Sequence, residues 1–90
     1  EEAVRKLPSE GKEARFIRTD VAVPEEVERA VRQTVDTYGQ LDILVCSAGI
    51  GGRRLGDGPV ESCTLEAWDA VMQVNLRGTF LALKYALPEL

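Results

Sequence analysis

The sequence predicts an α/β fold built in the order helix, strand, helix, strand, helix. Five of the six residues at 41–46 are apolar without alternation, and small residues and glycines follow at 47–52. Such a run is typical of a strand that is covered on both faces. Segments with helical periodicity flank it, and a right-handed crossover would make it parallel to a second strand upstream.

The chain begins with a predicted helix end and a predicted strand. Residues 1–10 carry apolar side chains at helical spacing among charges, and Pro8 followed by Gly11 ends the pattern. We expect these residues to be the last turns of a longer helix. Residues 14–21 are rich in strand-forming side chains and are predicted to form a strand.

A well-delimited helix is predicted between the two strands. Pro24 suits a first helical position, and Glu25 and Glu26 suit the positive first turn. Gly39 is the expected left-handed stop. Apolar or small residues repeat at three and four positions between these ends: Val27, Ala30, Val31, Thr34, Val35 and Tyr38.

A loop and a long helix complete the chain. Residues 47–63 contain Gly, Pro and Ser and predict the loop, after which Thr64 is a suitable N-cap. Asn75 and Gly78 stand inside the predicted helix although both are poor interior helix residues. Apolar residues form one stripe at helical spacing: Leu65, Trp68, Met72, Leu76, Phe80, Leu83, Leu87 and Leu90.

Composition bounds the class of protein. Ninety residues, 44% hydrophobic and 29% charged, suit one small globular domain and give neither a disordered nor a membrane-spanning pattern. A net charge of −4 without a long basic run predicts no nucleic-acid or membrane partner. Two cysteines and no histidine predict no metal site and a reducing, cytoplasmic setting. Because the chain starts without Met or a signal pattern, we expect it to be the middle of a longer protein.

Three short motifs resemble those of the short-chain dehydrogenase/reductase family. Asp42–Gly49 is similar to the family's Asp-(apolar)3-Asn-Asn-Ala-Gly motif, with Cys46 and Ser47 in place of the two asparagines. Thr19–Val21 resembles the end of the family's third strand, and Val74–Gly78 resembles the Asn-Leu-x-Gly segment of its fourth main helix. The chain is therefore identified as a member of this family, in its single-domain oxidoreductase branch.

The resemblance implies that residues 1–90 are part of one NAD(P)-binding Rossmann domain, a doubly wound parallel sheet, with no separate second domain. In the family's 3-2-1-4-5-6 order, the two predicted strands are the third and fourth, about 14 Å apart with two strands between them. The phosphate-binding glycine loop would precede this piece, and the catalytic Ser, Tyr and Lys would follow it. We therefore expect the chain alone to fold poorly and to lack dehydrogenase activity.

The resemblance also implies a cofactor site for NAD or NADP. The family uses the Asp at position 20 for the adenine amino group, assisted by the backbone of Val21. An Asp that only ends a strand or caps a turn is the alternative. Four residues would wall the adenosine ribose and lead toward the nicotinamide: Cys46, Ser47, Ala48 and Gly49. The substitutions at the first two remove the family's amide side chains there.

Asn75 is the catalytic candidate. In the family's Asn-Ser-Tyr-Lys tetrad, this Asn sits at a helix irregularity, and its main-chain carbonyl holds a water linked to the catalytic lysine. Asn75 followed by Gly78 in an otherwise strong helix is typical of such an irregularity. A tolerated polar residue on a helix face is the alternative.

Other motifs give weaker signals. Gly49–Gly52 begins like a dinucleotide fingerprint, but Arg54 occupies the place of the third glycine and no helix is predicted to open there. Gly51 and Gly52 are interpreted as loop flexibility near a substrate entrance. The arginines at 53 and 54 either meet an anionic substrate or are simply solvated. Tyr85 fails as a Tyr-x-x-x-Lys catalyst because position 89 is Glu.

The function implied by the resemblance is hydride transfer between NAD(H) or NADP(H) and a small carbonyl or alcohol. Family members commonly assemble as homo-oligomers through the long helix, so an oligomer is expected. A cofactor-binding sensor or scaffold that has lost the Tyr-Lys pair is one alternative. A non-nucleotide α/β module of the flavodoxin or receiver kind is another. The sequence leaves the choice of NAD or NADP and the identity of the substrate open.

Overall fold

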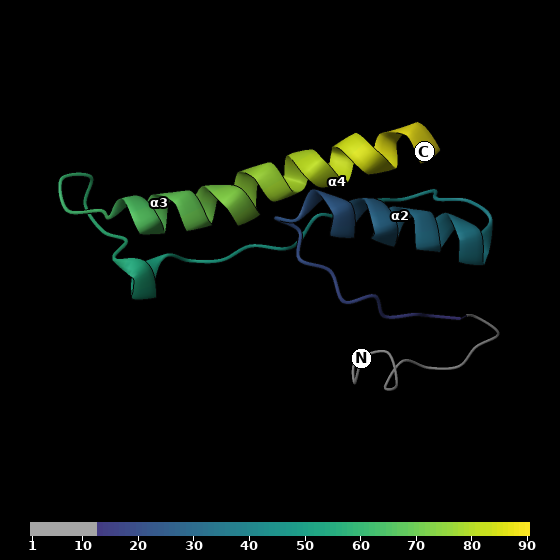
Figure 1. Ribbon diagram of the computed structural model, residues 1–90, viewed down its shortest axis with the longest axis horizontal. Helices are drawn as coiled ribbons and strands as arrows, with labels where there is room; N and C mark the ends of the chain where they lie inside the picture. The colour runs from purple at the N-terminus through teal and green to yellow at the C-terminus, as the bar shows by residue number, and fades with distance from the viewer. Residues whose placement is uncertain (1–12) are drawn as a thin grey trace.

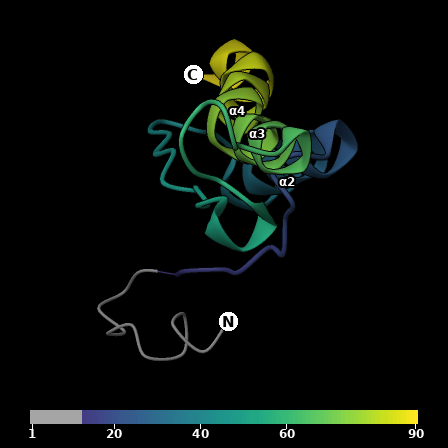
Figure 2. The same cartoon turned by 90° about the vertical axis from the view of Figure 1, so that its left-hand side faces the viewer.

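The structure, a computed structural model, describes residues 13–90, in which two helical runs pack side by side. The shorter run is helix α2 (Pro24–Tyr38). The longer run joins helix α3 (Leu65–Val71), π-helix η2 (Met72–Arg77), helix α4 (Gly78–Ala86) and 3-10 helix η3 (Leu87–Glu89). Figure 1 shows α2 lying along α4, and Figure 2 shows the non-helical segments gathered to one side of the helices. The helix predicted over residues 1–10 lies outside the described residues.

Helix α2 begins and ends where the sequence predicts. Pro24 is its first residue, and the carboxylates of Glu25 and Glu26 lie in its first turn. Gly39 ends the helix with a φ of 84°, and its N–H donates to the carbonyl of Val35 over 2.7 Å. Because a side chain is unfavourable at that φ, the glycine fixes the stop.

The long helical run is capped as predicted and contains the expected irregularity. The side chain of Thr64 accepts a hydrogen bond from the N–H of Ala67 at 3.1 Å, which satisfies one of the free donors at the start of α3. Within η2 the hydrogen bonds widen by one residue, so that the N–H of Gly78 donates to the carbonyl of Gln73. This π-turn places Asn75 in the middle of a continuous but irregular helix.

The two predicted strands are not formed in the described part of the chain. Residues 14–21 and 41–48 run as unpaired segments, so the predicted sheet is not confirmed in residues 13–90. A strand needs a neighbour about 4.8 Å away to complete its hydrogen-bond ladder, and neither segment has one among these residues. The expected burial on both faces also fails, because Ile43 and Val45 are each 78% exposed while Leu44 is half-buried.

The core is small and lies at the helix contacts. The buried apolar residues are Val27 of α2, Ala67 of α3, and Leu81 and Ala86 of α4. Much of the predicted apolar stripe on the long helical run is exposed instead, including Trp68, Leu76 and Phe80. The helices therefore bury one face against each other and leave a second apolar face open.

Candidate functional site: a π-turn that joins two loop segments

Asn75 is bound to the segment that follows the predicted second strand. Its Nδ2 donates to the carbonyl of Ile50 at 2.9 Å, and its Oδ1 accepts from the N–H of Ile50 at 2.8 Å. The side-chain amide thus pairs with one backbone residue through both of its polar groups. A Cβ placed on Gly49 would lie 3.4 Å from Oδ1 of Asn75, so the chain is closely packed beside this pair.

The main-chain carbonyl of Asn75 lies within the π-turn. The hydroxyl of Thr79 donates to this carbonyl at 3.2 Å. A carbonyl oxygen has two lone pairs and can accept more than one hydrogen bond. Single π-turns inside α-helices occur frequently at functional sites.

Asp20 lies in a turn that leads into α2. Its Oδ1 accepts from the N–H of Ala22 at 2.9 Å, and its own N–H donates to Oε1 of Glu26 at 2.9 Å. The N–H of Val23 closes the turn by donating to the carbonyl of Asp20 at 3.0 Å. The turn-capping alternative for Asp20 is therefore realised, while the exposed carboxylate retains acceptor capacity on its second oxygen.

Val21 lies directly against Gly78. A Cβ added to Gly78 would come within 2.9 Å of Cγ2 of Val21, closer than real contacts allow. Gly78 is buried and has a helical φ of −60°. The glycine is thus required by lack of space and not by an unusual backbone conformation.

Arg77 makes a long-range contact that the motif did not reveal. Its Nη1 donates to the carbonyl of Ala22 at 3.2 Å and to Oε1 of Gln73 at 3.0 Å. Arg77 occupies the variable position of the Asn-Leu-x-Gly segment, and only the fold brings it to a residue 55 positions earlier. The sequence signal is therefore limited to its place between Asn75 and Gly78.

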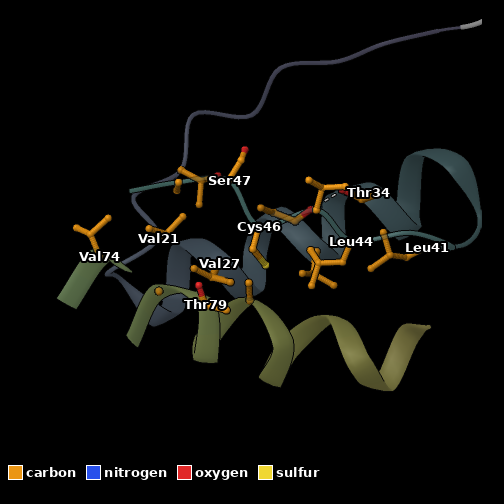
Figure 3. Close-up of a pocket in the computed structure, with 16 residues that line it drawn as sticks. Val21, Val27, Thr34, Leu41, Leu44, Cys46, Ser47, Val74 and Thr79 are labelled. Carbon is orange, nitrogen blue, oxygen red and sulfur yellow. Dashed lines mark hydrogen bonds between the residues drawn. The ribbon is translucent and has the colours of Figure 1, made fainter. Parts of the chain in front are cut away.

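Most of the predicted cofactor residues share one cavity of about 330 Å³ between the helices and the non-helical segments. Val21, Cys46, Ser47 and Ala48 line it, whereas Asp20 and Gly49 are not among its lining residues. Figure 3 shows Cys46 pointing toward the helices and the hydroxyl of Ser47 pointing away from them. The remaining walls are mostly apolar side chains of α2 and α4, including Val27, Val31 and Ala82.

The loop predicted over residues 47–63 contains a short ordered element. It contains 3-10 helix η1 (Arg53–Leu55), whose end is held by a 2.5 Å hydrogen bond from the hydroxyl of Thr64 to the carbonyl of Leu55. Gly52 is buried, and a Cβ there would lie 3.0 Å from Cγ2 of Val71. The interpretation of Gly52 as a source of flexibility is therefore wrong, because its role is close packing against α3.

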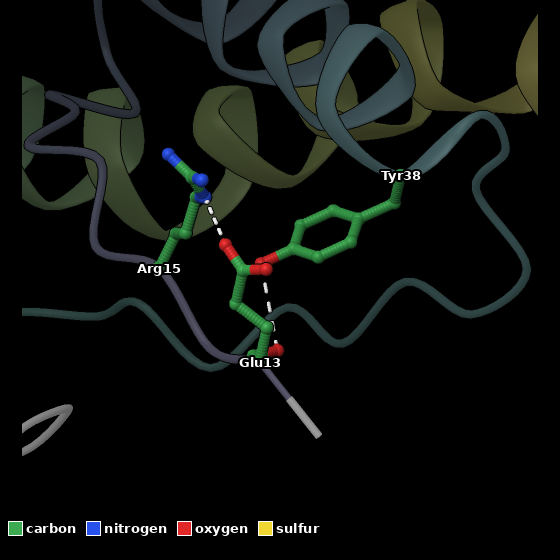
Figure 4. Close-up of polar contacts among 3 residues, drawn as sticks. All are labelled: Glu13, Arg15 and Tyr38. Atoms are coloured by element: carbon green, nitrogen blue, oxygen red, sulfur yellow. Dashed lines mark hydrogen bonds and ion pairs between the residues drawn. The ribbon is translucent and has the colours of Figure 1, made fainter. Parts of the chain in front are cut away.

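Glu13 makes polar contacts elsewhere on the surface, one with a nearby residue and one with the end of α2. Arg15 pairs with Glu13 at 2.7 Å, and the hydroxyl of Tyr38 donates to the carbonyl of Glu13 at 3.5 Å (Figure 4). The hydrogen bond and charge of Glu13 raise the pKa of Arg15. These contacts attach the segment before the site to the end of α2.

Residues 13–90 contain neither a group of potential metal ligands nor a helix that could span a membrane. These residues include no cluster of three or more His, Cys, Asp or Glu side chains able to hold a metal ion. The helices of the same region are too short or too polar to cross a bilayer.

Comparison with known proteins places the chain in a family. A family model described as enoyl-(acyl carrier protein) reductase matches residues 1–90, and several matching proteins are named short-chain dehydrogenase/reductase. The chain belongs to the short-chain dehydrogenase/reductase family. The family resemblance of the three motifs is thus confirmed.

Individual relatives support the assignment to the short-chain dehydrogenase/reductase family. An uncharacterized oxidoreductase of Thermotoga maritima is 43% identical over 99% of this chain and 33% of its own length. An uncharacterized NAD-dependent oxidoreductase of Mycobacterium tuberculosis is 36% identical over 97% of this chain and 30% of its own.

Among solved structures, a dehydrogenase/reductase from Sinorhizobium meliloti has a TM-score of 0.84 at 39% identity, covering 99% of this chain and 34% of that one. ElxO with bound NADP has a TM-score of 0.75 at 32% identity, covering 82% and 29%. These neighbours have the Rossmann fold, so the α/β class is right for the family although the described residues form no strand. The chain spans about a third of the length of the relatives it matches.

Proposed function

We propose that this chain is the central third of an oxidoreductase that transfers a hydride between NAD or NADP and a small carbonyl or alcohol. The observation that carries the proposal is the pair of hydrogen bonds between Asn75 and Ile50, made from inside a π-turn. Family membership supports the reaction class, because matched relatives are named oxidoreductases and one is named NAD-dependent. The NADP bound to ElxO supports the cofactor class.

The residues of the site fit a dinucleotide. Asp20 is exposed and has an oxygen able to accept from the adenine amino group, with the backbone of Val21 beside it. Ala48 and Gly49 are exposed and small, which lets a flat ring approach the main chain. When bound, the dinucleotide supplies the hydride or receives it at its nicotinamide ring.

The groups of the site would then have different tasks. The amide of Asn75 fixes the backbone at Ile50, which continues the wall formed by residues 46–49. The main-chain carbonyl of Asn75, in the π-turn, would hold a water that takes part in proton transfer. Ser47 can donate and accept one hydrogen bond each way at the wall, whereas Cys46 contributes a small side chain.

The proposal extends to the whole protein. Residues 1–90 would form part of one Rossmann domain, with the glycine loop before them and the Ser, Tyr and Lys after them. The chain alone would then be inactive. A homo-oligomer in the cytoplasm is the proposed assembly, and the exposed apolar residues of the long helical run suit a subunit contact: Trp68, Leu76, Phe80 and Leu83.

A cofactor-binding sensor or scaffold is a second candidate. The observation that favours it is the presence of Cys46 and Ser47 where the family has two asparagines. Loss of those amides removes hydrogen-bonding groups from the wall. The flavodoxin or receiver alternative is set aside by family membership.

Titration of the full-length protein with NAD+ and with NADP+ tests the proposal. Isothermal calorimetry should give saturable binding of at least one dinucleotide and weaker binding by the Asp20→Leu variant. The control is Asp36→Leu, which removes an exposed carboxylate on α2 outside the proposed site. Absence of binding of both dinucleotides would contradict the enzyme and the sensor alike.

A further inference from the structure

The Asp20–Val23 turn is held by local hydrogen bonds and by one long-range hydrogen bond. Its own hydrogen bonds are local and connect Asp20 to Ala22, Val23 and Glu26. Arg77 adds a long-range bond from the long helical run, since its Nη1 donates to the carbonyl of Ala22 at 3.2 Å. A bond across 55 residues can fix where the whole turn sits, which local bonds within the turn cannot do.

The guanidinium of Arg77 is also oriented by a residue of its own helical run, Gln73. Nη1 carries two hydrogens, and the second hydrogen bond goes to Oε1 of Gln73, one helical turn earlier, at 3.0 Å. Holding a long side chain in one geometry costs conformational entropy, and the bond to Gln73 reduces the freedom that remains. Arg77 is exposed, so its contact with Ala22 positions the turn without a buried charge.

Two consecutive residues of the long helical run therefore contact two consecutive residues of the turn. Arg77 bonds to the carbonyl of Ala22, and Gly78 packs against Val21. The same π-turn holds Ile50 through Asn75. η2 is thus connected both to the turn that carries Asp20 and to the wall that ends at Ile50.

We infer that Arg77 is a positioning residue for recognition of the adenine ring. This inference rests on the proposed function, because it assumes that Asp20 and Val21 meet the adenine. Arg77 acts through the Ala22 carbonyl and touches neither cofactor nor substrate. Its loss lets the turn shift, so that Asp20 no longer meets the adenine amino group in a favourable geometry.

The test compares two dinucleotides that differ at one group of the purine. The full-length protein is titrated with NAD or NADP, whichever binds more tightly, and with its hypoxanthine analogue, in which a carbonyl oxygen replaces the amino group. The wild type should prefer the adenine form. Arg77→Met keeps an aliphatic side chain but removes the donors, and should reduce this preference about threefold to tenfold, the range for one hydrogen bond.

Three controls separate positioning from general damage. Arg29→Met makes the same charge change at an exposed position of α2 and should keep the wild-type preference. The kcat of Arg77→Met at saturating cofactor should stay within about twofold of the wild type, because Arg77 acts on binding of the adenine end. Should Arg77→Met fail to fold, Gln73→Met removes only the group that orients Arg77 and should reduce the preference in the same direction.

The possible outcomes are distinguishable. An Arg77→Met protein that binds both dinucleotides more weakly but with the wild-type preference would overturn the inference while leaving the proposed function intact. If Arg77→Met does not fold, an unchanged preference in Gln73→Met would overturn the inference in the same way. A wild type that binds both forms equally would instead overturn the role of Asp20 on which the inference rests.

Discussion

Gly78 is required because Val21 leaves no space for a side chain at this position. The glycine has an ordinary helical φ, yet a methyl group on it would overlap Cγ2 of Val21 at 2.9 Å. Intrinsic helix propensity favours Ala over Gly by about 1 kcal/mol, so an unconstrained site would gain from the exchange. At this position the close approach of the Asp20–Val23 turn makes the exchange of Gly for Ala destabilising.

Gly78→Ala is therefore expected to destabilise the full-length protein by about 1–3 kcal/mol, the usual cost of overpacking. Urea unfolding followed by circular dichroism measures the change in the free energy of unfolding. The double variant Gly78→Ala with Val21→Ala removes the clashing methyl and should recover part of the loss. A single variant more stable than the wild type would show that the turn does not press on α4.

Asn75→Asp tests the paired hydrogen bonds with almost no change in shape. One carboxylate oxygen can still accept from the N–H of Ile50, but the other replaces a donor and faces the carbonyl of Ile50. The loss of the donor and the new repulsion should lower the free energy of unfolding by about 1–3 kcal/mol. Gln33→Glu, the same amide-to-acid change on exposed α2, is the control and should change stability little.

At the scale of the elements, the ends of the helices are the most securely encoded features. The left-handed φ of Gly39 strains any residue with a side chain, so Gly39→Ala should cost about 1–2 kcal/mol. Gly51→Ala is the matched control, because a Cβ there meets nothing within 4 Å, and it should stay within about 0.5 kcal/mol. Equal melting temperatures for the two variants would contradict the role of Gly39 as the stop of α2.

The sequence alone predicts the elements whose limits are set by local interactions. Pro24, Gly39 and Thr64 act on backbone groups a few positions away, so the limits of α2 and the start of α3 can be predicted without knowing the fold. The strand prediction at 41–46 is not confirmed in the described residues, because a hydrogen-bond ladder needs a partner strand that the local pattern does not supply. Burial of that segment also depends on what covers it.

The residues of the site also differ in whether the sequence alone predicts them. Asn75 is predicted because a family motif surrounds it, and the π-turn then gives its backbone an unusual geometry. Arg77 and Gly52 are missed or misinterpreted because their roles depend on Ala22 and Val71, which are distant in sequence. The adenine role of Asp20 stays a prediction, since the structure shows its turn but no ligand.

At the scale of the whole molecule, the part of the chain that the structure describes is extended and not compact. Its radius of gyration is 16.1 Å, whereas a compact chain of this size is expected near 12 Å. Few residues are fully buried, and large apolar side chains such as Ile43, Val45 and Phe80 are exposed. The described residues therefore lack the buried apolar area that a stable independent domain requires.

We expect the 90-residue chain by itself to show no cooperative thermal transition. Burial of Ile43, Val45 and the outer face of the long helical run would require further protein around it. Differential scanning calorimetry of the isolated chain and of the full-length protein measures this directly. A sharp heat-absorption peak for the isolated chain would contradict the interpretation of its exposed surfaces.

The most direct test of the proposed function is cofactor-dependent turnover by the full-length protein. A panel of small carbonyl and alcohol substrates is supplied with NAD(H) or NADP(H), and the nicotinamide absorbance is followed over time. We expect hydride transfer with at least one dinucleotide. In Asn75→Asp the kcat should fall about tenfold or more, because loss of the bond to the Ile50 carbonyl disturbs the π-turn whose main-chain carbonyl would hold the proton-transfer water. Tight dinucleotide binding without turnover on any substrate would contradict the enzyme and favour the sensor.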